Sequence, residues 1–255
     1  VICTPRDASG LGGLAQPGAR IAEMDLSRDR EAAILKDLVP DGSTVVHSVP
    51  LIRFDGETHD PTPEMLAAIG TKPRRMIYLS TSGVYGKQSW VDEHTQPAPV
   101  LERQVLRVHA EQAVARGKWE SLILRPAGIY GPGRGVHVSM RDGRHKLLGD
   151  GSNFHSRIHV DDLVQIVHSA IDSDLRGAFP VADEHPCPAM EIAQFCADLL
   201  GLSLPPSVGA GDISETLRFD RRIDARAIRR HLNVTLRYPS YRQGIPACLE
   251  EESRP

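Results

Sequence analysis

Short apolar segments rich in β-branched residues alternate along this chain with longer amphipathic segments. The apolar segments are continuous rather than alternating in polarity, which is typical of strands covered on both faces of a parallel sheet. The strand–helix–strand order therefore predicts an α/β fold built on a doubly wound parallel sheet. The expected strands cover residues 1–4, 20–26, 43–52, 74–81 and 121–129.

The clearest amphipathic segment covers residues 97–116 and predicts a helix, since its apolar residues recur with helical spacing. Another helix is expected from Ser27, which can cap its amino terminus, to about Leu38. After Gly135 a polar, glycine-bearing loop separates further segments. These are "RIHV" (157–160), which ends a strand, a helix over 161–171, the segment "GAFPVAD" (177–183), a helix over 188–200, and a tail of two short helices around a strand.

The change of pattern after Gly135 also indicates two parts of unequal size. We expect a sheet domain over residues 1–182 and a small carboxyl-terminal α/β lobe over 183–255. Residues 136–155 would contribute to the substrate side.

Composition excludes several partners. The formal net charge is −3 with no polybasic block, so no nucleic-acid partner is expected. The longest apolar runs are far too short to span a bilayer, so no membrane partner is expected either. The four cysteines are scattered without a Cys-x-x-Cys pair, which favours reduced, mostly packed thiols and a cytoplasmic location. We expect no metal site, and interpret "HVDD" (159–162) as a strand end followed by an aspartate cap.

Four motifs carry a resemblance to a known family. They are "YLSTSGVYG" (78–86), "LRPAGIYGPGRG" (124–135), "RIHVDDLV" (157–164) and "PVADEHPCPAMEIAQFCADLLG" (180–201). In this order they resemble the extended short-chain dehydrogenases, the NAD-dependent epimerase/dehydratase superfamily, and in particular its smaller, atypical members. The resemblance covers nearly the whole chain. It implies a Rossmann-type fold, an NAD or NADP cofactor, a small-molecule substrate, and a monomer or homodimer.

The resemblance assigns the catalytic positions one residue at a time. Thr81 stands four residues before Tyr85, where the family keeps a catalytic Ser or Thr that polarises a substrate oxygen. Matching "RVHAEQAV" (107–114) to the family pattern places Arg107 at the position of the catalytic Lys and Arg103 at that of the catalytic Tyr. Arg107 can still hold the ribose, whereas Arg103 stays protonated and cannot act as a general base. Arg103 would instead bind an anionic substrate group, with Tyr130 or water relaying the proton.

The cofactor side departs from the family at the amino terminus. Residues 1–6 match the second strand of the fold, so its first strand and glycine-rich loop are expected to be missing through truncation or loss. Arg6 at the end of that strand slightly favours NADP, although an exposed arginine beside a turn is an equal alternative. Asp25 and Leu26 would border the adenine. The remaining expected contacts are Ser48, Val49 and Pro50 along the cofactor, and Pro126, Ala127 and Gly128 beside the nicotinamide.

The substrate side is less specified. Tyr85 and Arg134 are expected to contact the substrate, and His155 stands where nucleotide-sugar enzymes of the family carry an arginine. That replacement and the short carboxyl-terminal lobe argue against a nucleotide sugar. The leading hypothesis is an NAD(P)-dependent oxidoreductase or epimerase/dehydratase-like enzyme acting on a small polar substrate with non-standard acid/base residues. The alternative, motivated by the missing Tyr–Lys couple, is a non-catalytic dinucleotide-binding sensor or protein-interaction module.

Overall fold

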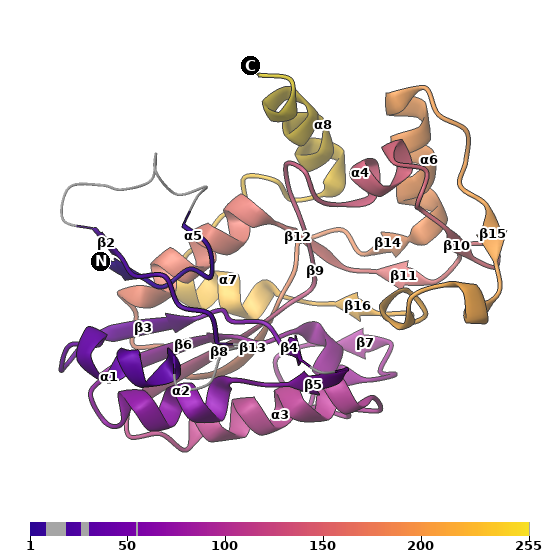
Figure 1. The fold of residues 1–255 in the computed structure, drawn as a ribbon. Helices are drawn as coiled ribbons and strands as arrows, with labels where there is room; N and C mark the ends of the chain where they lie inside the picture. The colour runs from indigo at the N-terminus through magenta and orange to yellow at the C-terminus, as the bar shows by residue number, and fades with distance from the viewer. Residues whose placement is uncertain (9–18, 27–30, 55, 255) are drawn as a thin grey trace.

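A four-stranded parallel sheet forms the centre of the molecule (Figure 1). The computed structural model describes residues 1–8, 19–26, 31–54 and 56–254. The strands lie in the order β13 (Gly177–Val181), β8 (Glu120–Pro126), β6 (Arg75–Leu79) and β3 (Thr44–His47). The residues of β6 and β8 are almost all buried, which confirms the prediction of strands covered on both faces.

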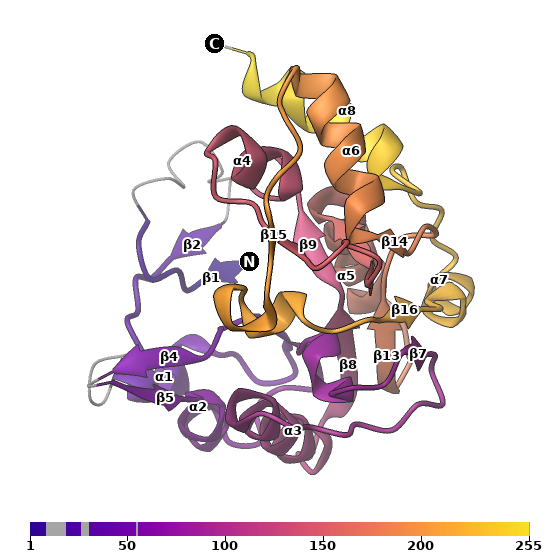
Figure 2. The ribbon, with the colours of Figure 1, turned by 90° about the vertical axis from the view of Figure 1, so that its right-hand side faces the viewer.

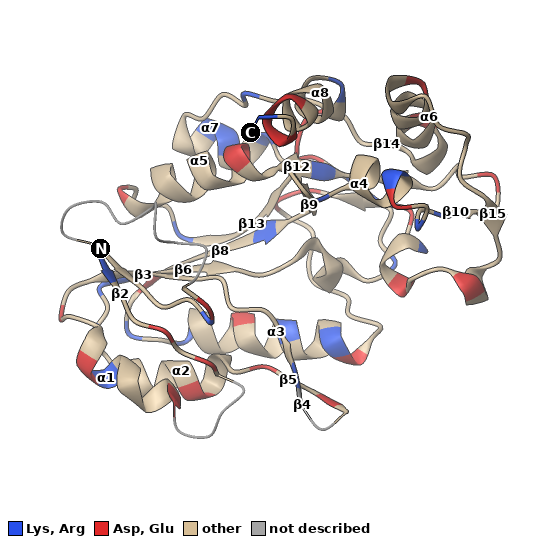
Figure 3. Ribbon diagram, turned by 45° about the horizontal axis from the view of Figure 1, so that its top comes forward, with Lys and Arg blue, Asp and Glu red and all other residues tan. Residues whose placement is uncertain are grey.

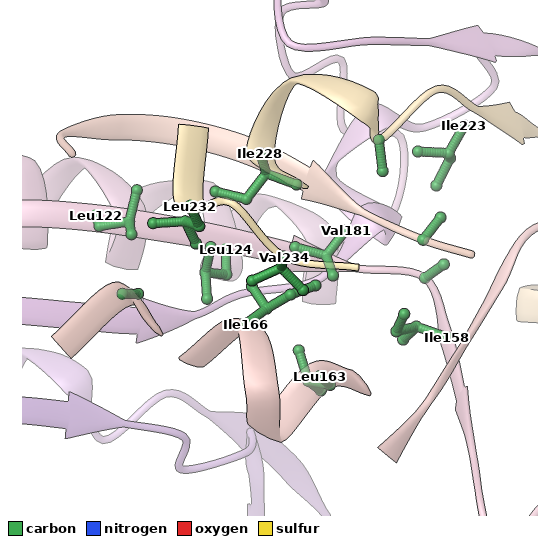
Figure 4. Packing of buried hydrophobic residues seen from close by; sticks show 14 of the residues in the cluster. Leu122, Leu124, Ile158, Leu163, Ile166, Val181, Ile223, Ile228, Leu232 and Val234 are labelled. Atoms are coloured by element: carbon green, nitrogen blue, oxygen red, sulfur yellow. The ribbon is translucent and has the colours of Figure 1, made fainter. Parts of the chain in front are cut away.

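Helices cover both faces of this sheet (Figure 1). Leu122 and Leu124 of β8 pack in the core on one face with α5 (Val160–Ile171) and α7 (Arg226–Leu232), as Figure 4 shows. Ile123 faces the opposite core, which is formed with α1 (Leu35–Leu38), α2 (Thr62–Ile69) and α3 (Glu102–Ala115). Successive strand residues therefore supply two different cores, so the predicted doubly wound α/β fold is confirmed.

The amino-terminal strands are shorter than expected. β1 (Ile2–Cys3) and β2 (Arg20–Ile21) form a separate two-stranded parallel pair outside the central sheet. The predicted strand 43–52 is likewise split, because after β3 the chain passes Pro50, which cannot donate to a sheet, and enters the hairpin of β4 (Ile52–Phe54) and β5 (Glu57–His59). Of the helix predicted over 27–38, residues 27–30 lie outside the described residues, and a 3₁₀ turn η1 (Glu31–Ile34) leads directly into α1.

Helix α3 carries two of the candidate catalytic positions and begins later than predicted. It starts at Glu102 rather than at residue 97. Pro99 disfavours helical backbone at the residue before it, and the Gln104 side chain accepts hydrogen bonds from the backbone N–H groups of Val100 and Leu101. The helix is thereby capped just after the prolines.

The carboxyl-terminal lobe lies beyond the carboxyl ends of the strands (Figure 2). Residues 222–236 leave this lobe and return to the sheet, where Ile223, Ile228 and Val234 join its core. The expected boundary near residue 182 thus separates segments that share one core.

The elements outside the central sheet and its covering helices are η2 (Ser82–Tyr85), β7 (Trp90–Val91), β9 (Gly128–Tyr130), α4 (Val136–Arg141), β10 (Leu147–Leu148), β11 (Phe154–His155), β12 (Arg157–His159), β14 (Cys187–Pro188), α6 (Ala189–Leu200), β15 (Ser207–Val208), η3 (Ala210–Asp212), η4 (Glu215–Leu217), β16 (Arg222–Ile223) and α8 (Tyr241–Glu252).

Two local predictions are wrong. The tail has its two helices, α7 and α8, but no strand between them, because the backbone N–H groups of Arg237 and Tyr238 donate to the Asp162 carboxylate at 2.7 and 2.9 Å instead of to a neighbouring strand. Asp162 is therefore not the cap of α5. His159 is the N-cap, and its Nδ1 accepts from the N–H of Asp161.

All four cysteines are free; Cys187, Cys196 and Cys248 are buried and Cys3 is exposed. The described part of the chain contains no group of three or more His, Cys, Asp or Glu side chains arranged to hold a metal ion. None of the described helices combines the length and apolarity needed to cross a membrane.

Candidate active site

A cleft of about 1180 Å³ lies between the carboxyl edge of the sheet and the carboxyl-terminal lobe. This is the edge at which open α/β sheets bind their ligands. The loops that follow β6 and β8 line one side of the cleft, and residues from α4 to β12 line the other. Of the expected site residues, the cleft brings together Pro50, Thr81, Arg103, Arg107, Pro126, Ala127, Gly128, Tyr130, Arg134 and His155.

Thr81 lies directly beyond β6, in extended backbone at the start of η2. Its Oγ1 accepts a hydrogen bond from the backbone N–H of Gly83 at 3.0 Å. A hydroxyl has one proton and two lone pairs, so this contact occupies a lone pair and leaves the proton available to a ligand. The arrangement fits a donor that polarises a substrate oxygen.

Most of the N–H donors of Arg107 are used in hydrogen bonds within the protein. Its Nη1 donates to the Tyr78 hydroxyl at 2.7 Å, both terminal nitrogens donate to the carbonyl of Val49 at 3.3 Å, and the Asp60 carboxylate lies 3.7 Å away. These contacts pin α3 to the segment after β3. Arg107 lines the cleft, but most of its donors are already used, which the sequence did not reveal.

The network around Arg107 continues under the cleft. Asp60 Oδ1 accepts from the backbone N–H and the hydroxyl of Thr62, and the Thr62 hydroxyl contacts Nε2 of His47 at 2.9 Å. Burial lowers the pKa of His47 to about 4, so this imidazole is neutral near pH 7. The two charged members of the cluster are therefore Arg107 and Asp60, whose opposite charges cancel within a buried ion pair.

Arg103 differs from Arg107 although both lie on one face of α3. Its side chain is 38% exposed, and its nearest charged partner is Glu215, at 3.8 Å. Its Nε is buried without a hydrogen-bond partner in the described structure. The guanidinium thus has donors that an anionic ligand can use.

The two tyrosines do not have the environments that we expected. Tyr130 lines the cleft, but its hydroxyl is buried without a partner among the described residues, and a Cβ on Gly244 of α8 would lie 2.2 Å from it. Burial raises the pKa of Tyr130, so the phenol keeps its proton near pH 7, which opposes a proton relay. Tyr85 is fully buried, accepts a hydrogen bond from Arg125 and does not line the cleft, so its substrate contact stays a prediction without support from this geometry.

The expected cofactor contacts are divided between two places. Pro126, Ala127 and Gly128 line the cleft, but the N–H groups of Ala127 and Gly128 donate to Val181 and Ser156, which leaves carbonyl and Cα groups for a ligand. Pro50 and Arg107 also line the cleft, whereas the remaining contacts lie outside it. Arg6 forms an ion pair with Asp25 at 3.5 Å, Leu26 lines a second cavity beside α1 and α2, and Ser48 and Val49 are not lining residues.

The lobe side of the cleft is polar. His155 Nε2 accepts from the Asn153 amide at 2.9 Å, and burial, followed by the charge of Arg157, lowers the pKa of His155 to about 4. Arg157 donates to the carbonyl of His155 and to Sγ of Cys187. The positive charge on this wall therefore belongs to Arg157 rather than to His155.

Among the charged residues that line the cleft, cations far outnumber acids, although the protein as a whole has a net charge of −3. One acidic residue among those described, Asp212, lines it. Acidic and basic residues are interspersed over α1 and α3, as Figure 3 shows. A concave surface of one charge sign attracts ligands of the opposite sign, so the cleft is suited to an anion. The cations are Arg53, Arg103, Arg107, Arg134, Arg144, Lys146, Arg157 and Arg221.

Arg221 is a site residue that the sequence reasoning missed. It is 8% exposed, and it donates to the carbonyl oxygens of Ser82 at 2.8 Å, of Gln88 at 3.3 Å and of Gly86. The lobe thereby holds the loop that follows Thr81. The run of arginines in "RFDRR" (218–222) was a possible signal, but it does not tell which arginine turns inward.

Comparison with known proteins agrees with this architecture. Residues 61–181 match the model of the NAD dependent epimerase/dehydratase family. The match runs from just before α2 to the end of β13, so the segment that resembles this family includes Thr81, α3 and the loop after β8.

A curated relative, the 3-diazoavenalumate denitrifying reductase of a Streptomyces species, is 31% identical over 106 residues. These residues make up 39% of this chain and 35% of the reductase, so the match spans little more than a third of that relative. A conserved protein of unknown function from Silicibacter pomeroyi DSS has a solved structure that is 29% identical, with a TM-score of 0.76, over 99% of this chain and 90% of that one.

The structure of MoeE5 in complex with UDP-glucose and NAD is 21% identical, with a TM-score of 0.77, over 98% of this chain and 89% of that one. At this identity the similarity shows the fold alone. Together the comparisons agree with the Rossmann-type fold that the motifs predicted.

Proposed function

We propose that this protein binds a nicotinamide dinucleotide and catalyses an oxidoreductase or epimerase-like reaction on a small polar substrate that carries an anionic group. The family match and the partial similarity to a reductase support the reaction class. The ligands in the MoeE5 structure support the cofactor class. The observation that carries the proposal is the Thr81 hydroxyl, which lies in the cationic cleft with its proton unused by Gly83.

In this proposal Thr81 donates to the substrate oxygen whose carbon gains or loses hydride. The dinucleotide supplies or accepts that hydride. Pro126, Ala127 and Gly128 would lie beside the nicotinamide, because they line the cleft at the end of the neighbouring strand. Arg107 would reach the ribose with the donors that Val49 and Tyr78 leave free.

Arg103 would hold the anionic group of the substrate. It occupies the position of the family's tyrosine, but its guanidinium keeps its proton near pH 7, so it contributes charge and orientation rather than proton transfer. A solvent water would exchange the proton with the substrate, since the burial of Tyr130 opposes that role. The cofactor choice remains open to experiment, with Arg6 and its Asp25 partner as the residues to vary.

The test uses the full-length protein. NADH and NADPH binding is measured by the change in their fluorescence, and turnover is followed by absorbance with a panel of hydroxy and keto acids. We expect Thr81→Ala to lower turnover by about 10²-fold, the typical cost of removing one such donor, while Thr81→Ser keeps most of it because the hydroxyl remains. Equal turnover by Thr81→Ala and the parent protein would contradict the proposed role.

A second candidate function is a dinucleotide-binding sensor without turnover. It is favoured by one observation: the cation at the lysine position, Arg107, is held by Val49, Tyr78 and Asp60. A sensor would bind NADH or NADPH and convert no member of the panel. Absence of binding to either dinucleotide would contradict both candidates.

A further inference from the structure

Residues 212–219, which we name the strap, lie in the segment that connects β15 to β16 (Figure 2). The strap includes η4, and six of its residues line the cleft: Asp212, Ile213, Ser214, Thr216, Leu217 and Phe219. A ligand that entered the cleft would therefore meet the strap.

Polar side chains of the cleft hold the strap by its oxygens. The Asn153 amide donates to the carbonyls of Leu217 at 2.9 Å and Phe219 at 3.3 Å, and Lys146 Nζ donates to the carbonyl of Asp212 at 3.4 Å. Glu215 contributes the carboxylate that lies 3.8 Å from Nη2 of Arg103. An amide, an ammonium and a guanidinium of the cleft thus all face oxygens of the strap, and these are the donors with which a protein binds an anionic ligand.

These contacts are weak compared with those of the core. Ile213 is the one buried residue of the strap, at 7% exposure, and η4 is a single 3₁₀ turn. Glu215 is 51% exposed and its ion pair with Arg103 is solvated. Segments with one apolar anchor and exposed hydrogen bonds belong to the low-stability end of a structure, where local opening is easy.

The strap also leaves polar atoms beneath it unpartnered. Nε of Arg103 and Oδ1 of Asn153 are buried and have no hydrogen-bond partner among the described residues. Buried polar atoms without partners are costly and uncommon. The strap thus provides no acceptor for the N–H at Nε of Arg103 and no donor for Oδ1 of Asn153.

We propose that the strap is a displaceable lid, and that the Glu215 carboxylate occupies the position on Arg103 that the anionic group of the ligand takes when it binds. The inference rests on one part of the proposed function, namely that Arg103 binds the anionic group of the ligand. Glu215 competes with the ligand for Arg103, so it sets both affinity and access.

The test compares pyrophosphate binding, measured by calorimetry, in the full-length protein and its variants. Glu215→Gln removes the competing charge and should tighten binding by up to about fivefold, the range set by exposed ion pairs. Glu250→Gln makes the same charge change on the exposed face of α8 and should leave affinity within about twofold. In an Arg103→Gln background the effect of Glu215→Gln should disappear, because the two residues act through one contact.

The proposal would be overturned if Glu215→Gln and Glu250→Gln changed the pyrophosphate affinity equally. It would also be overturned if Glu215→Gln changed the affinity as much in the Arg103→Gln background as in the parent protein, or if none of the proteins bound pyrophosphate. Amide hydrogen exchange gives a second readout, since pyrophosphate should accelerate exchange within residues 213–218 if it displaces the strap. Unchanged or slower exchange there would contradict a displaceable lid. The dinucleotide measurements are separate, so failure of the cofactor assignment would leave these results interpretable.

Discussion

Arg221 links the carboxyl-terminal lobe to the loop after Thr81, and Arg221→Met isolates that link. The guanidinium is 8% exposed and donates to the carbonyl oxygens of Ser82, Gly86 and Gln88. Methionine keeps much of the aliphatic stem and its packing but none of the donors. The substitution therefore leaves three carbonyl oxygens without their partner.

The magnitude follows from these contacts. A hydrogen bond to a charged group contributes about 1.5 kcal/mol or more, and an abandoned buried acceptor costs about 1 kcal/mol or more. Three such contacts, discounted for water that enters from the cleft, give a loss of about 3–5 kcal/mol in the free energy of unfolding. Natural domains have about 5–15 kcal/mol in total, so Arg221→Met should lower the urea midpoint by a large fraction.

The assay is urea denaturation followed by circular dichroism, with Arg226→Met as the matched control. Arg226 is 73% exposed and pairs with Asp224 on the surface, so its replacement should give no measurable change. A loss below about 1 kcal/mol for Arg221→Met would refute the assigned role, because it would mean that water replaces the guanidinium at little cost.

Three further outcomes follow from the packing. Glu111→Gln should cost about 3–5 kcal/mol in urea denaturation, because it leaves the buried Arg125 guanidinium without its 2.7 Å carboxylate partner. Burial raises the pKa of Asp183 from 3.8 to about 7, so the folded state binds this proton more tightly than the unfolded state does. The free energy of unfolding should therefore fall between about pH 4 and pH 7, relative to that of Asp183→Asn. A difference between the two proteins that stays constant over this pH range would contradict the prediction. Gly244→Ala should cost about 1–3 kcal/mol, measured by thermal denaturation, since its Cβ would overlap the Tyr130 hydroxyl.

The inner strands of the central sheet could be predicted from the sequence because they are buried on both faces. Continuous apolarity over the lengths of 74–81 and 121–129 is typical of a fully buried strand, and both segments are strands of the sheet. The segment 43–52 looked equally continuous, yet it divides at Pro50. Apolarity alone cannot show where a strand leaves the sheet, whereas the missing N–H of proline does.

Thr81 was predictable for a related reason. Its place at the carboxyl end of a buried strand, four residues before Tyr85, fixes it at the ligand edge of the sheet. The environment of Tyr85 was not predictable, since nothing in the sequence shows that Arg125 faces its hydroxyl from the next strand. Long-range contacts of this kind, including those of Arg221, depend on tertiary packing and leave no local pattern.

The two arginines of α3 show how one helix face can keep its positions and change its chemistry. At i and i+4 they stand where the family resemblance expects a proton-transfer couple, whereas a guanidinium can only donate hydrogen bonds. The fold gives them different neighbours: Arg107 meets Val49, Tyr78 and Asp60, while Arg103 meets the solvated carboxylate of Glu215. One arginine therefore fixes the floor of the cleft and the other offers charge to its interior. In the proposed function, turnover would rest on Thr81, on the fixed positive charge and on a proton drawn from solvent, so Thr81→Ser and Glu215→Gln are the variants to compare first.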